Sequence, residues 1–359
     1  MKNNFKIYLS KFLYIFFLFL SLNIFFFSTD KIKAKSFEIN DIDISRPFKI
    51  NFDKNEVIDE GFIKAYDLLI SLIVNSTDKK KINSINLSDI KGMIESFTIK
   101  EEKFIDEIYY VNLGVTFNKK KIFNYLESKN IFPSIPEKNE FLFIPIIIDE
   151  DQKDLLIFYN NKIFESWNKY ENKSHLIKYI LPTEDLEDLS LLKSKFDTIE
   201  EYDFKEITNR YDLDDSIVAL IFRNQKKLRI LSRINLDGEV ILQNETFSKM
   251  NLNDDETIKS IIKNLKLTYE DFWKTRNRIN TSIRLTLNIK VDNIKNSKII
   301  NLEKNLDEID LIYDFFIFKF DKDFTYYQII FNGTPDIFLK RMSDKNYRFN
   351  TQNKIWTLK

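Results

Sequence analysis

The sequence predicts an α+β protein in which an N-terminal signal helix is followed by two or three small α/β modules, the last of them ferredoxin-like (βαββαβ). Three observations support this prediction. An apolar stretch lies close to the N-terminus, the spacing of apolar residues alternates between helical and strand periods, and the last third of the chain carries six elements in a βαββαβ order. The chain has 359 residues, more than one hydrophobic core usually serves.

Residues 1–36 have the order of parts found in a secretory signal peptide. Three lysines precede an apolar stretch at residues 12–27, and a polar segment follows it. The stretch is shorter than the roughly 20 residues that span a bilayer as a helix. Small residues before the junction predict cleavage between Ser36 and Phe37, and hence a periplasmic protein. The alternatives are an uncleaved anchor, with residues 12–27 as an inner-membrane tether, and a buried core helix.

Composition excludes several classes of function. Basic and acidic residues number 55 each, and 49 and 54 without residues 1–36, so neither nucleic acid nor an anionic lipid surface is the expected partner. The chain has no cysteine, which removes disulfides, thiolate metal sites and cysteine nucleophiles. Its five glycines are too far apart to build a phosphate-binding loop. No cofactor is therefore expected.

The first predicted module covers residues 37–136. Asp53 and Glu56 have the spacing of a capping box, and apolar residues follow at steps of three and four, so a helix is expected to begin there. Apolar residues alternate over 109–117, which predicts a strand with one buried face. A helix over 119–129 is expected to follow.

The second predicted module covers residues 137–275. The apolar run at 141–148 is typical of a strand covered on both faces, although Pro145 lacks a donor and favours a sheet edge. A further strand is expected over 216–222. Residues 227–246 are predicted to form a hairpin that turns at Asp237-Gly238, a dipeptide favoured in tight turns.

The third predicted module covers residues 276–359. Strands are predicted at 282–291, 311–320, 324–331 and 354–358, and helices at 297–309 and 335–342. This βαββαβ order is typical of a ferredoxin-like domain.

Two groups of side chains are candidate sites. The acidic block from Glu184 to Asp188 offers the carboxylate oxygens that calcium or magnesium prefers, but Thr183 is also a candidate helix cap, with acids suited to the first turn of that helix. The aspartates at 212, 214 and 215 favour a solvated turn. His175 is the one histidine and has no serine-nucleophile motif beside it, so an ordinary surface or strand-edge histidine is expected.

Four segments together resemble a known family. They are the helix containing residues 65–69, the stretch 111–136, the strand 141–148 and the block 181–189. In these segments the chain resembles the proteobacterial envelope family catalogued as domain of unknown function two thousand and sixty-six. The chain departs from the family pattern in its few glycines and in Ser134-Ile135, where members often carry a tryptophan. The resemblance implies export and the order of the domains, and it implies no catalytic residues.

We therefore expect an exported, non-catalytic interaction or assembly component of the cell envelope with an envelope protein as its partner. The alternative is a carboxylate-based, metal-assisted envelope hydrolase. A hydrolase predicts a cleft in which several carboxylates converge, whereas an interaction module predicts an exposed sheet edge or apolar patch. A serine–lysine pair also stays open, because lysine is abundant throughout the chain.

Overall fold

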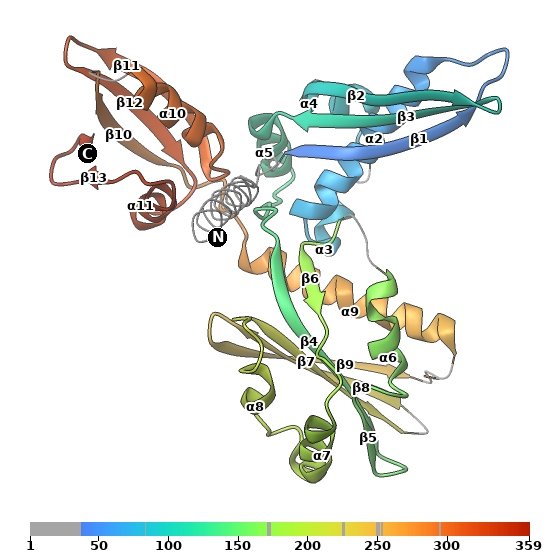
Figure 1. Ribbon diagram of the computed structural model, residues 1–359. Helices are drawn as coiled ribbons and strands as arrows, with labels where there is room; N and C mark the ends of the chain where they lie inside the picture. The colour runs from blue at the N-terminus through green and yellow to red at the C-terminus, as the bar shows by residue number, and fades with distance from the viewer. Residues whose placement is uncertain are drawn as a thin grey trace, which may run out of the picture. The chain divides into compact units, whose positions relative to one another are not determined.

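The structure is a computed structural model that describes residues 37–82, 84–170, 174–224, 227–248, 252, 254–293 and 296–359 (Figure 1). The predicted signal helix and Ser36 lie outside these residues. Residues 36–359 form one compact unit. Phe37, the predicted mature N-terminus, is buried and packs edge-on against Phe123 with ring centroids 5.4 Å apart.

The described residues form a mixed α+β fold with three sheets and ten α-helices, which confirms the predicted class. The three sheets lie within residues 38–117, 139–248 and 285–358. No helix among the described residues is long and apolar enough to cross a membrane.

The first sheet is antiparallel, with strand order β1-β3-β2. Its strands are β1 (Glu38–Pro47), β2 (Ile94–Ile105) and β3 (Ile108–Phe117), and the helices beside them are α2 (Lys54–Ile73), α3 (Ser76–Lys79), α4 (Leu87–Met93) and α5 (Lys119–Ser128). Asp53 caps α2 as predicted, because its carboxylate accepts the backbone N–H of Asn55 at 2.8 Å. α2 lies along one face of the sheet (Figure 1), where Leu113 and Val115 of β3 are fully buried. The edge strands β1 and β2 were not predicted.

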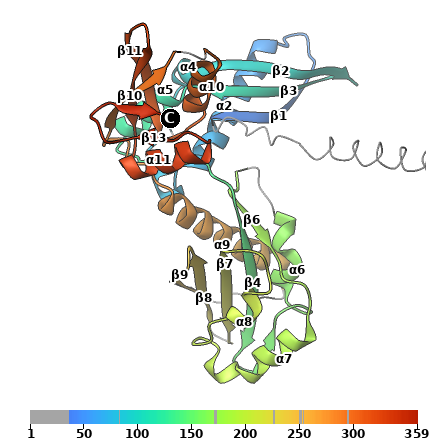
Figure 2. The same cartoon turned by 60° about the vertical axis from the view of Figure 1, so that its left-hand side comes forward.

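The second sheet has the strand order β5-β4-β7-β8-β9, and β6 pairs with β4 beside β5. Its strands are β4 (Asn139–Asp149), β5 (Asp154–Leu156), β6 (Ile177–Ile180), β7 (Ser216–Arg223), β8 (Lys227–Leu236) and β9 (Glu239–Ser248). Its α-helices are α6 (Lys162–Ser166), α7 (Leu186–Ser194), α8 (Lys205–Thr208) and α9 (Asp255–Arg276). α9 covers one face of this sheet, and α7 and α8 lie on the other (Figure 2).

Pro145 does not place β4 at an edge, contrary to the expectation from its missing donor. On one side β4 pairs with β7 through residues 142–149, and on the other it pairs with β6 through residues 139–142 and with β5 through residues 147–149. Pro145 falls in the gap between those two short partners, so the ladder needs no N–H there. The side-chain amide of Asn161 donates to the Pro145 carbonyl oxygen at 2.9 Å and fills part of the gap.

The hairpin of β8 and β9 turns at the predicted dipeptide. Asp237 and Gly238 have φ values of 51° and 80°, which suit the tight turn of a two-residue loop. The two strands pair over ten consecutive positions without a register shift.

The third sheet has the order β11-β12-β10-β14-β13. Its elements are β10 (Leu285–Asp292), α10 (Asn296–Asp307), β11 (Ile312–Phe320), β12 (Phe324–Phe331), α11 (Pro335–Asp344), β13 (Phe349–Asn350) and β14 (Trp356–Leu358). All four strands and both helices predicted here are present, and β13 is additional. β14 pairs in parallel with β10.

Candidate functional site

The acidic block forms the start of a helix and is bound to an arginine. Asp185 caps α7 by accepting the N–H of Glu187 at 2.7 Å. Asp188, whose side chain is 3% exposed, pairs with Arg210, and the same arginine lies 3.3 Å from Asp185. The prediction that Thr183 caps this helix is therefore wrong, because the cap is Asp185, two residues later. The predicted helix itself is confirmed. Arg210 thus occupies two carboxylates of the block, those of Asp185 and Asp188.

The second acidic group also has a structural role. Asp215 is buried, accepts from the side-chain amide of Asn139 at 2.6 Å and from the N–H of Asp237 at 3.2 Å, and so joins β4 to the hairpin turn. Residues 212 and 214 are exposed, as a solvated turn requires. Nowhere in the described chain do three or more histidine, aspartate or glutamate side chains gather as a metal site would require.

A row of buried charges on α9 was not predicted. Lys266, Glu270 and Lys274 follow one another at intervals of four residues and are at most 4% exposed. The Lys266 ammonium donates to the Tyr170 carbonyl oxygen at 3.2 Å and lies 5.3 Å from the centre of the Trp167 ring, which stabilises the buried cation.

Glu270 binds the chain just before β6. Its carboxylate accepts the backbone N–H of Leu176 at 2.9 Å and that of Ile177 at 3.0 Å. Burial raises the pKa of Glu270, although these two N–H groups and the Lys274 ammonium favour the charged form. The carboxylate thus satisfies two backbone donors that would otherwise be buried without acceptors.

His175 directly precedes these two residues. Burial, and then the positive charges of Lys266 and Lys274, lower the pKa of His175 to about 4. The imidazole is therefore neutral at physiological pH. His175 lies two residues before β6, which agrees with the expected position beside a strand. Burial and the two lysines nevertheless disfavour the charged form of its imidazole.

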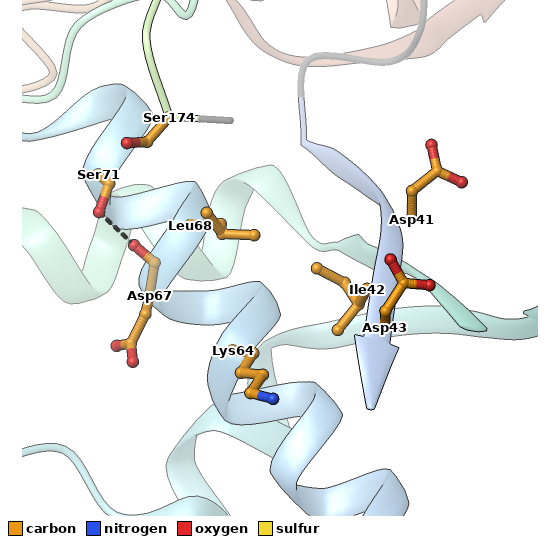
Figure 3. Close-up of a pocket in the computed structure, with 8 residues that line it drawn as sticks. All are labelled: Asp41, Ile42, Asp43, Lys64, Asp67, Leu68, Ser71 and Ser174. Carbon is orange, nitrogen blue, oxygen red and sulfur yellow. Dashed lines mark hydrogen bonds between the residues drawn. The ribbon is translucent and has the colours of Figure 1, made fainter. Parts of the chain in front are cut away.

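A hollow with a volume of about 390 Å³ lies between α2 and β1. Its lining residues are Asp41, Ile42, Asp43, Lys64, Asp67, Leu68, Ser71 and Ser174 (Figure 3). Burial raises the pKa of Asp67, and the Ser71 hydroxyl donates to the Asp67 carbonyl oxygen at 2.6 Å. The hollow was not predicted, because its two walls are more than 20 residues apart along the chain.

The structure brings one serine and one lysine together at this hollow. The Lys79 ammonium donates to the Ser71 hydroxyl at 2.5 Å, and burial lowers the pKa of Lys79. Asp67 and Asp271 act in the opposite direction and favour the ammonium form, which cannot serve as a general base. The serine proton is also directed to the backbone of α2. We therefore interpret the hydrogen bond between Lys79 and Ser71 as a structural contact that joins α3 to α2.

Exposed apolar side chains follow the outer strands of all three sheets. They are Phe97, Ile99, Phe104 and Ile105 on β2, Val240 and Leu242 on β9, and Phe316, Ile317, Phe318 and Phe320 on β11, each between 39% and 71% exposed. Contiguous exposed apolar side chains are uncommon on proteins that act alone and are typical of interaction surfaces.

Comparison with known proteins adds no relative. No protein-family model matches the chain, and no curated protein sequence matches it. The resemblance to the proteobacterial envelope family thus stays a prediction.

Proposed function

We propose that this protein is an exported, non-catalytic interaction or assembly component of the cell envelope, located in the periplasm. The observation that carries the proposal is the exposure of apolar side chains along sheet edges. A partner can extend a sheet by main-chain hydrogen bonds to such an edge, while side-chain contacts supply specificity. The partner class that we propose is an envelope protein.

The disposition of charges supports the same proposal. Arg210 binds Asp185 and Asp188 of the acidic block, and backbone and side-chain donors bind Glu270 and Asp215. A carboxylate-based, metal-assisted hydrolase would need these acids free in a cleft. The alternative function therefore gains no support from the acidic block.

Export, and the ferredoxin-like character of the last module, are parts of this proposal. A cut between Ser36 and Phe37 would leave every described strand and helix intact, because β1 begins at Glu38. In the last module β12 lies between β10 and β11, as expected when a hairpin strand inserts into a split βαβ unit.

In-cell photo-crosslinking tests the proposed function. A photoreactive phenylalanine would replace Phe97, Leu242 or Ile317 on the three exposed edges, and Lys263 on the outer face of α9 would serve as the control position. We expect envelope proteins to be captured from at least one edge and not from the control. Fractionation of the same cells should find the protein in the periplasm or attached to the inner membrane. A chain found in the cytosol without crosslinks would contradict the proposal.

A further inference from the structure

The outer strands of the three sheets differ in how well they are protected against pairing. β1 ends in Pro47 and has a register shift against β3, and β2 and β11 each have two register shifts and carry lysines. β5, β6 and β13 are four residues long or shorter. Bulges, lysines, prolines and short lengths are the devices by which proteins prevent edge-to-edge pairing.

β9 has none of these four devices, although it carries two acidic residues, Glu239 and Glu245. It is ten residues long, contains no lysine or proline, and follows β8 without a register shift. It pairs on one side only, and Figure 2 shows it as the outermost strand of its sheet. No backbone hydrogen bond from elsewhere in the described chain reaches its outer side. On the face away from α9, Val240 and Leu242 are 55% and 58% exposed.

We propose that β9 pairs antiparallel with β9 of a second copy of this chain, so that the two six-stranded sheets become one continuous sheet. A two-fold axis normal to the sheet keeps every side chain on its own face, so residues whose numbers have the same parity face each other. Several pairing registers centred near the middle of β9 satisfy this condition. The charged and polar side chains along the strand determine which of them is favoured.

The register centred on Asn244 is the complementary one. It places Gln243 opposite Glu245, Leu242 opposite Thr246 and Ile241 opposite Phe247, so the carboxylate meets an amide and the apolar residues on the α9 face meet each other.

Other registers near the middle of β9 are worse. A centre at Glu245 places the two Glu245 carboxylates opposite each other, where like charges repel. A centre at Leu242 places Glu239 directly opposite Glu245, where like charges repel. A centre at Gln243 places each of these carboxylates opposite an apolar residue.

The absence of cysteine allows a direct test of this register. Residues opposite each other in an antiparallel pair have Cα atoms about 4.5–5.5 Å apart, within disulfide range. The full chain carrying N244C, purified in mild detergent and oxidised, should form a disulfide dimer at least about tenfold faster than T98C, an exposed position on the protected edge β2. Equal rates would overturn the proposal.

Mixed variants test the same register independently. A mixture of L242C and T246C should give a crosslinked heterodimer, whereas L242C alone should not, because its two copies would lie about 13 Å apart along the strands. If L242C forms a disulfide with a second L242C chain as fast as with T246C, the proposal is overturned.

Sedimentation equilibrium in density-matched detergent completes the test. The unmodified chain should sediment at twice its 43.2 kDa mass and L242K at the single-chain mass, with unchanged far-ultraviolet circular dichroism. Because L242K keeps residues 1–36, association through that segment would persist in the variant. A monomeric unmodified chain overturns the second-copy proposal. If the photoreactive residue at position 242 still crosslinks to another envelope protein in cells, the proposed function stands although the second-copy proposal fails.

Discussion

The Glu270 carboxylate accepts the backbone N–H of Leu176 at 2.9 Å, although the two residues are 94 positions apart in the chain. This contact joins α9, the long helix that covers the second sheet, to the segment that enters β6. Because Ile177 donates to the same carboxylate, one side chain satisfies two consecutive buried backbone groups. The buried Glu270 carboxylate therefore has a structural role as a hydrogen-bond acceptor.

Replacing Glu270 should separate the acceptor role from the charge. We expect E270L to lower the free energy of unfolding by about 2–4 kcal/mol, because two buried N–H groups lose their acceptor. E270Q keeps one carbonyl oxygen and should cost about 1 kcal/mol. Urea denaturation measures both, with K263L on the exposed face of α9 as the control, expected within about 0.5 kcal/mol of the unmodified chain. Equal effects of E270L and K263L would contradict the assignment.

Stability should depend on the protonation of His175. Its pKa is about 4 in the folded protein, below the ordinary value of 6.5, because of burial and the neighbouring Lys266 and Lys274. As the pH falls from 6.5 towards 4, the unfolded chain takes up a proton that the folded chain does not, so stability falls. Allowing for the partial solvent access of the imidazole, we expect a loss of about 1–2 kcal/mol.

The variant H175Q isolates this effect. Glu270 has a raised pKa, so its own contribution to stability increases as the pH falls and opposes that of His175. Both chains contain Glu270, and the difference between their melting temperatures therefore reports the histidine. We expect the difference to grow in favour of H175Q as the pH is lowered from 7 to 4.5. A pH-independent difference would show that the imidazole is not protected from protonation.

The parts of the fold that were predicted depend on local contacts. Asp53 caps α2 through a residue two positions away, and Asp237-Gly238 turns the hairpin within its own four residues. The βαββαβ order of the last third also follows from local periodicity, since each element has an apolar face of its own. Such features are visible in a short window of sequence.

The parts that were not predicted depend on distant segments. α9 has a capping aspartate at Asp254 and apolar residues at helical spacing, but Lys266, Glu270 and Lys274 interrupt its buried face and mask the pattern. Those charges are tolerated because distant residues supply their partners. Tyr170 and Leu176, about 95 positions away, bind Lys266 and Glu270, and the Val74 carbonyl oxygen, 200 positions away, accepts from Lys274 at 3.5 Å. The same reason explains why the hollow beside α2 and the pairing of Asp188 with Arg210 were not foreseen.

Replacing two helical glycines by alanine should change the stability of the protein in opposite directions. A β-carbon at Gly61 in α2 would lie 2.3 Å from the side-chain Cδ1 of the fully buried Leu113 of β3, so G61A must displace this side chain or the helix and should cost about 1–3 kcal/mol. A β-carbon at Gly92 in α4 meets nothing within 4 Å, and G92A should stabilise by about 0.5–1 kcal/mol through helix propensity. Thermal denaturation of the two variants compares them directly. Stabilisation by G61A would mean that α2 and β3 are not in close contact.

The pairing of Asp188 with Arg210 gives the acidic block a measurable role. R210A leaves a carboxylate that is 3% exposed without its cation, and we expect a loss of about 2–4 kcal/mol in the free energy of unfolding. D188N removes the buried charge, so the double variant R210A/D188N should be more stable than R210A alone, and the double-mutant cycle should yield a coupling energy of about 1–3 kcal/mol. Additive effects would contradict the pairing. Calcium or magnesium should leave the melting temperature of the unmodified chain unchanged, because Asp185 caps α7 and Asp188 is buried against Arg210, so that neither carboxylate is free for a cation.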